Sequence, residues 1–171
     1  DVPVLGYLFF IGDRQQTDLP YIGADHEHGE WGKVRREPAL TPDQIVREAQ
    51  AAYDRYGFTT FKLKGGVLNG EKEVQVMKAL HQAFPKAKLD IDPNGAWSLN
   101  EAVQYASEMK GLLNYIEDPC GAENGFSGRE ILAEFQRRTR IPTATNMVDT
   151  DWRQMASSLI LNAVSIPLAD P

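Results

Sequence analysis

Two hydrophobic patterns alternate along the chain. Stretches with an apolar residue at every third or fourth position predict amphipathic helices, and short apolar runs between them predict strands. The helices are expected from residue 42 to Gly57, from about 71 to 84, from 98 to Gly111, from about 127, and from about 150 to 161. The strands are expected at residues 4–11, 59–64, 88–92, 113–117, 143–147 and 163–168.

The helix starts carry a recognisable signal. Thr41, Ser98 and Ser127 are each followed three residues later by Gln or Glu, the capping-box arrangement that closes the first turn of a helix. Regular alternation of such helices with strands indicates an α/β fold with parallel strands and right-handed crossovers. A complete eight-stranded barrel takes about 250 residues. The 171 residues therefore predict a partial barrel.

The segment from about residue 13 to 40 shows neither pattern and is too long for a simple connection. Because it follows the first strand, we expect it at the same end of the sheet as the other strand ends, where it would form a lid over a substrate. It contains His26 and His28. We interpret these two histidines as solvated and not as a metal pair, because the loop is polar.

Composition narrows the class of protein. The net charge is −6 and no basic run is present, which argues against nucleic acid as a partner. No apolar run approaches the ~20 residues that span a bilayer, and the sequence does not begin with a signal peptide, so no membrane partner is expected. The single cysteine, Cys120, excludes an internal disulfide and fits a reducing compartment. We expect a cytoplasmic protein.

Lys62 and Lys64 form the most informative feature of the sequence. Alternate residues of a strand lie on one face, so both ammonium groups are expected to emerge together just before a glycine turn. Like charges held close in a partly desolvated site favour the neutral form of one lysine, which is a base. Taken alone, the pair is also typical of solvated lysines at a strand edge.

Oxygen-bearing side chains follow the next strands. Asp92 and Asn94 end the strand at 88–92, Glu117 and Glu123 follow the strand at 113–117, and Asn146 ends the strand at 143–147. Because the carboxyl ends of parallel strands meet at one mouth of a barrel, these oxygens are expected to converge on a hard cation.

Five motifs, at residues 61–66, 92–98, 117–123, 142–147 and 166–171, together resemble the glucarate dehydratases of the enolase superfamily over essentially the whole chain. The resemblance implies a partial TIM-type (β/α) barrel of about six strands and five helices. It also implies an N-terminal capping domain, two last barrel strands and a histidine base, all absent from the sequence. Residues 1–171 are accordingly expected to form a partial catalytic barrel domain.

The same resemblance assigns the metal site. Asp92, Glu123 and Asn146 are implied as ligands of Mg²⁺. Glu117 is the rival of Glu123, because it occupies the strand end where most of the superfamily places its second ligand.

Further roles are implied for the side chains around that metal. Lys64 would be a base, and Lys62 would contact the substrate carboxylate and lower the pKa of Lys64. Asp170 would orient the absent histidine. The residues expected to bind substrate are Tyr7, Lys62, Asp92, Pro93, Asn94 and Asn146.

The implied reaction starts with removal of the proton next to a carboxylate of D-glucarate or L-idarate, a small aldarate. Loss of water then gives 5-keto-4-deoxyglucarate. The full-length protein is expected to be a homo-oligomer, and the isolated segment is expected to be inactive without the histidine. Two alternatives stay open: a relative of low or no activity that only binds metal or is structural, and a Schiff-base aldolase using Lys64. The oxygen ligands argue against the aldolase, which needs no metal.

Overall fold

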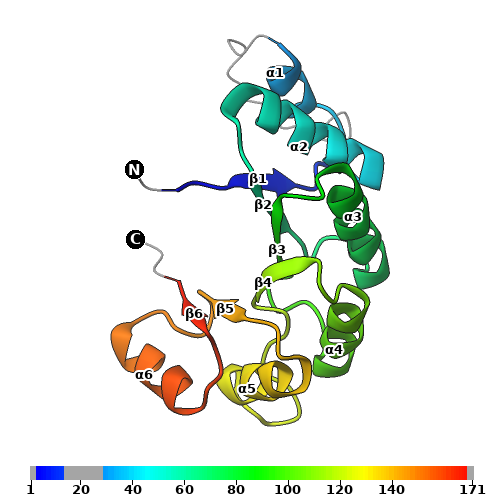
Figure 1. The fold of residues 1–171 in the computed structure, drawn as a ribbon. Helices are drawn as coiled ribbons and strands as arrows, with labels where there is room; N and C mark the ends of the chain where they lie inside the picture. Colours follow the sequence, from blue (N-terminus) through cyan, green and yellow to red (C-terminus); the bar gives the residue numbers. More distant parts are fainter. Residues whose placement is uncertain (1–2, 14–28, 169–171) are drawn as a thin grey trace.

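All six predicted strands are present and form one parallel sheet in chain order. The computed structural model describes residues 3–13 and 29–168. The strands are β1 (Gly6–Phe9), β2 (Thr60–Lys64), β3 (Lys88–Asp92), β4 (Leu113–Glu117), β5 (Thr143–Thr145) and β6 (Ile166–Pro167). Figure 1 shows them curving into an arc whose two ends, β1 and β6, lie on the same side of the molecule. The parallel α/β fold predicted from the alternating pattern is confirmed.

The helices lie along the convex side of this arc (Figure 1). They are α1 (Glu30–Val34), α2 (Pro42–Tyr56), α3 (Gly70–Ala83), α4 (Leu99–Glu108), α5 (Gly128–Thr139) and α6 (Trp152–Ile160). The capping boxes predicted at Thr41, Ser98 and Ser127 are all formed. No helix in the described ranges is both long and apolar enough to cross a membrane.

A continuous apolar layer fills the space between sheet and helices. Phe61 and Leu63 of β2 and Ile91 of β3 belong to it, together with Val74 and Leu80 of α3. Because side chains alternate along a strand, burying these residues under the helices turns their neighbours toward the concave side of the arc. The core thereby determines which face carries the polar side chains.

The helix α1 was not predicted, since its segment was expected to be irregular. It is only five residues long, and tertiary contacts hold it in place. The Trp31 ring packs edge-on against Tyr56 with ring centroids 5.6 Å apart, and Glu30 accepts a hydrogen bond from Arg47 Nε at 2.7 Å. Such contacts to α2 leave no periodic signal in a short segment. His26 and His28 lie outside the described residues, and so does most of the predicted lid.

The fifth strand is shorter than the predicted range of 143–147. It ends at Thr145 because Asp118 captures the backbone N–H groups of Asn146 and Met147, at 3.1 and 3.2 Å. The carboxylate thereby turns the chain out of the sheet.

Candidate active site and metal site

Both lysines of β2 reach acids on the concave side of the sheet. The register pairs Lys62 with Asp90 and Lys64 with Asp92 on β3. The ammonium nitrogen of Lys64 lies 2.5 Å from Asp92 Oδ2, and Lys62 forms a buried ion pair with Glu117 of β4. The lysines therefore project from one face, as their spacing predicts.

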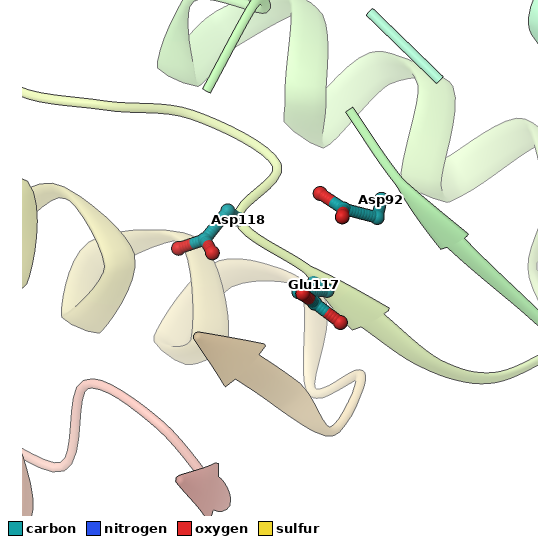
Figure 2. A group of neighbouring side chains, drawn as sticks. All are labelled: Asp92, Glu117 and Asp118. Atoms are coloured by element: carbon teal, nitrogen blue, oxygen red, sulfur yellow. The ribbon is translucent and has the colours of Figure 1, made fainter. Parts of the chain in front are cut away.

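Three buried carboxylates gather beside them. Figure 2 shows Asp92 at the end of β3, Glu117 at the end of β4 and Asp118 immediately after it. One oxygen from each lies within 4.8 Å of the other two, and no other such group of three His, Cys, Asp or Glu side chains occurs in residues 3–13 and 29–168. An arrangement of hard oxygen donors suits Mg²⁺ or Ca²⁺.

Burial affects the protonation of two of these carboxylates, Glu117 and Asp118. Burial raises the pKa of Glu117, although the hydrogen bond from Lys62 opposes the shift. Burial likewise raises the pKa of Asp118 against the hydrogen bonds from Thr145, Asn146 and Met147. Both carboxylates are therefore easier to protonate than exposed acids, and a nearby positive charge would favour their ionised forms.

Burial and Asp92 are the largest influences on the pKa of Lys64, and the expectation that Lys62 lowers it stays a prediction. Burial does act to lower the pKa of Lys64, but the hydrogen bond and negative charge of Asp92 outweigh it, and the pKa is raised. As found, Lys64 is an ammonium group and not a free base.

Tyr7 of β1 lies beside the lysine pair. The ammonium nitrogen of Lys62 lies 5.1 Å from the centroid of the Tyr7 ring. Burial, as the largest influence, raises the pKa of Tyr7 to about 12. The hydroxyl thus stays protonated near neutral pH and is available as a hydrogen-bond donor to an anionic ligand.

Asp118 has a structural role that the sequence did not reveal. Its backbone adopts a φ of 39°, and its carboxylate accepts hydrogen bonds from Thr145 Oγ1 at 2.5 Å and from the N–H groups of Asn146 and Met147. These bonds fix the backbone of Asn146 at the mouth. The only sequence signal was an acid directly after a predicted strand, which does not distinguish such a role from metal binding.

Glu123 stands apart from the three-carboxylate cluster. Its Oε2 accepts a hydrogen bond from Leu99 N, at the first residue of α4, at 3.1 Å. Its loop nevertheless lies next to the loop after β3, because Gly95 N donates to Asp118 O at 2.7 Å and Cys120 bridges to Ala96 and Trp97. Glu123 therefore sits on a loop beside the mouth, half-buried and held by that backbone hydrogen bond.

Two further residues were predicted to take part in the site, Asn94 and Asp170. Asn94 follows Asp92 and Pro93 with a φ of 53°; its N–H donates to Asp92 Oδ1 at 3.0 Å and its side-chain amide to Gly65 O at 3.4 Å. It thus lies at the mouth. Asp170 is outside the described residues.

Three comparisons place these features among known proteins. The family model described as enolase C-terminal domain-like matches residues 44–171. A Streptomyces coelicolor protein named "Probable glucarate dehydratase" is 39% identical over 158 residues, which are 89% of this chain and 34% of that protein. An o-succinylbenzoate synthase from Thermosynechococcus vestitus is 35% identical over 86 residues, 44% of this chain and 27% of that protein.

Among solved structures, an enolase from Pseudomonas fluorescens with bound magnesium, potassium and tartrate superposes with a TM-score of 0.83 at 41% identity. The match covers 99% of this chain and 36% of that one. The chain therefore spans about a third of the length of the relatives that it matches over most of its own length.

Proposed function

The chain belongs to the enolase C-terminal domain-like family, and from this we propose that it is the central barrel segment of a Mg²⁺-dependent acid-sugar dehydratase. The substrate would be an aldarate such as D-glucarate or L-idarate, and the product 5-keto-4-deoxyglucarate. One observation carries the proposal: Lys64 lies 2.5 Å from Asp92 at the edge of a cluster of three buried carboxylates. A potential base and a potential metal ligand thus share one mouth.

The buried negative charge at this mouth fits a divalent cation. Asp92, Glu117 and Asp118 offer only oxygen, and buried carboxylates gathered within 4.8 Å repel one another unless positive charge lies among them. Lys62 and Lys64 supply part of that charge. A metal ion bound at Asp92 would supply the rest and would also stabilise the negative charge that forms on the substrate carboxylate.

For the ligands we propose Asp92, Glu123 and Asn146. Glu117 is already neutralised by Lys62, and Asp118 already accepts three hydrogen bonds from the turn after β5. Glu123 is half-buried and accepts one backbone N–H, so it can exchange this contact for a cation with less rearrangement. Glu117 remains the competing ligand, because one of its oxygens lies within 4.8 Å of an Asp92 oxygen.

The other side chains would act directly on the substrate. Lys64 would accept the proton on one face, since Asp92 can no longer hold it as an ammonium group once that carboxylate is a ligand. Lys62 would stay charged beside Glu117 and bind the substrate carboxylate. Tyr7 and Asn94 would donate hydrogen bonds.

Asp170 would orient a histidine on the opposite face, as the resemblance implies. The complete protein would need that histidine for D-glucarate, and we propose that it is a cytoplasmic homo-oligomer.

The test uses the full-length protein with Mg²⁺ and D-glucarate or L-idarate in D₂O. Proton exchange next to the carboxylate and the keto product are followed by NMR. Lys64→Ala should lower exchange on the face of that lysine by roughly 10² to 10⁴-fold, the contribution of a positioned general base. Lys78→Ala is the control, because Lys78 is an exposed lysine paired with Glu108. Retained exchange in Lys64→Ala would remove this lysine from the mechanism.

The ligand assignment has its own test. Calorimetric titration with Mg²⁺ should show weaker binding in Glu123→Gln by roughly 10-fold or more, and a smaller change in Glu117→Gln. The reverse order would assign the second ligand to Glu117. Absence of Mg²⁺-dependent turnover by the full-length protein would favour a relative that only binds metal. Borohydride trapping with a keto acid would indicate a Schiff-base enzyme instead.

A further inference from the structure

A fully buried glutamate of α3 binds the loop that follows the lysine pair. Glu73 lies in the first turn of the helix, and its carboxylate accepts three consecutive backbone N–H groups. Gly66 N donates to Oε2 at 3.0 Å, and Val67 N and Leu68 N both donate to Oε1 at 2.9 Å. Consecutive N–H groups that converge in this way form an anion-binding nest, which is occupied here by the chain's own carboxylate.

The nest follows Lys64 closely in the chain. Gly65 N donates to Asp92 O at 2.8 Å, and a Cβ added to Gly65 would lie 2.7 Å from Glu73 Oε2. A Cβ on Gly66, whose φ is 74°, would overlap the carbonyl oxygen of Pro93. The residues after Lys64 are thus confined between Glu73 on one side and the backbone of Asp92 and Pro93 on the other.

This confinement also reaches the loop after β3. The side-chain amide of Asn94 donates to Gly65 O at 3.4 Å, so any shift of Gly65 moves the partner of Asn94. The same short segment therefore connects the Glu73 carboxylate with Lys64 through the backbone and with Asn94 through a hydrogen bond.

We propose that Glu73 is a positioning residue that holds Lys64 and Asn94 in place at the mouth by fixing the backbone of residues 65–68. The proposal rests on the catalytic role proposed for Lys64. A general effect of an acid at a helix start does not account for the contacts, because Glu71 lies in the same first turn, is exposed and binds none of these N–H groups. Glu71→Gln is therefore the matched control.

The chemistry of the nest suggests two variants. In Glu73→Gln the volume is kept, but one carboxylate oxygen becomes an NH₂ group that cannot accept a hydrogen bond. At least one of the three N–H groups then loses its partner. In Glu73→Ala all three lose it, and the cavity left behind is lined by converging donors. Added formate, a free carboxylate, should enter that cavity and restore the bonds.

The first experiment does not depend on the proposed function. Hydrogen exchange of a peptide covering residues 65–69 is followed by mass spectrometry in the full-length protein. Exchange should rise by roughly 10-fold or more in Glu73→Gln and stay unchanged in Glu71→Gln, since each lost bond opens a local segment. Formate should slow exchange again in Glu73→Ala but not in Glu73→Gln. Equal exchange in the Glu73 and Glu71 variants would overturn the proposal.

The second experiment measures the position of the lysine itself. Acetylation of Lys64 by a small amine-reactive acetyl donor, quantified by mass spectrometry, should be faster in Glu73→Gln than in Glu71→Gln, and formate should reverse the gain in Glu73→Ala. With substrate, proton exchange should fall by roughly 10²-fold in Glu73→Ala and partly recover with formate. If the loop opens while Lys64 labelling and substrate exchange stay unchanged, Glu73 is only structural. If the wild type exchanges no aldarate proton, the proposed function fails, and Lys64 labelling still decides the role of Glu73.

Discussion

The junction between β2 and α3 and the interface between α2 and β1 each bury one glutamate, in very different ways. Glu73 at the junction accepts three backbone N–H groups at 2.9 to 3.0 Å. Glu48 at the interface is only 3% exposed and accepts one N–H, from Phe9 at 3.4 Å. Burial raises the pKa of Glu48 to about 7, with the Phe9 bond and the charge of Arg35 opposing the shift.

The difference shows what offsets the free-energy cost of burying a carboxylate in this chain. Both glutamates come from neighbouring helices and both are buried, so burial alone does not separate them. The number of donors does, because each N–H that points at a carboxylate replaces part of its lost hydration. Where the loop supplies three donors the glutamate can order the backbone around it. Where the strand supplies one, burial raises the pKa of the glutamate to about 7.

The largest loss of stability is expected where a buried carboxylate forms an ion pair with a buried lysine. Glu117→Gln leaves the Lys62 ammonium without its partner, and these side chains are only 2% and 8% exposed. The free energy of unfolding should fall by about 3 to 5 kcal/mol, the usual cost of breaking a buried pair from one side. Urea denaturation at pH 7 without metal measures it.

The double variant Lys62→Met with Glu117→Leu is the control for that loss. It removes both charges together and should recover most of the stability, since an apolar pair of similar volume is often neutral. A loss below about 1 kcal/mol in Glu117→Gln would show that Lys62 readily finds another partner.

The second prediction concerns Glu48. Because the pKa of Glu48 is about 7 in the folded protein and 4.5 ordinarily, the folded state binds the extra proton. Its contribution to stability is complete below about pH 4.5 and is lost as the pH rises through about 7. Glu48→Gln keeps an oxygen for Phe9 N and removes this loss. At pH 8 it should be more stable than the wild type by about 2 to 3 kcal/mol.

The free energy of unfolding of the wild type and of Glu48→Gln, measured from pH 4.5 to 8, tests whether the wild type loses stability as the pH rises. The two stabilities should be similar at the acidic end and diverge as the pH rises. A constant difference across the range would show that Glu48 does not titrate there.

The smallest effect is expected from a cap on the same helix as Glu48. Thr41 Oγ1 accepts the Gln44 N–H and completes a capping box at the start of α2. Thr41→Ala should cost about 1 kcal/mol. The loss should be the same at pH 4.5 and 8, because no ionisable group takes part. A pH-dependent loss would mean that the cap and Glu48 are coupled through α2.

The local features were predictable for a physical reason. The capping boxes at Thr41, Ser98 and Ser127 involve residues three positions apart, so the sequence contains both partners of each bond. The same holds for the shared face of Lys62 and Lys64, which follows from the alternation of a strand. The helix α1 was missed because its stability comes from contacts with α2, which a five-residue segment does not show.

The sequence by itself determined the order of the strands and of the helices after residue 41, the capped starts of three of those helices and the set of oxygen and amine side chains at the mouth, because these depend on neighbours along the chain. Only the tertiary structure decided which partners meet. Lys62 meets Glu117 across 55 positions and Lys64 meets Asp92 across 28, through the register of parallel strands and the turns that follow them. Since a pKa depends on those distances and on burial, the structure and not the spacing decided that Lys64 is an ammonium group here.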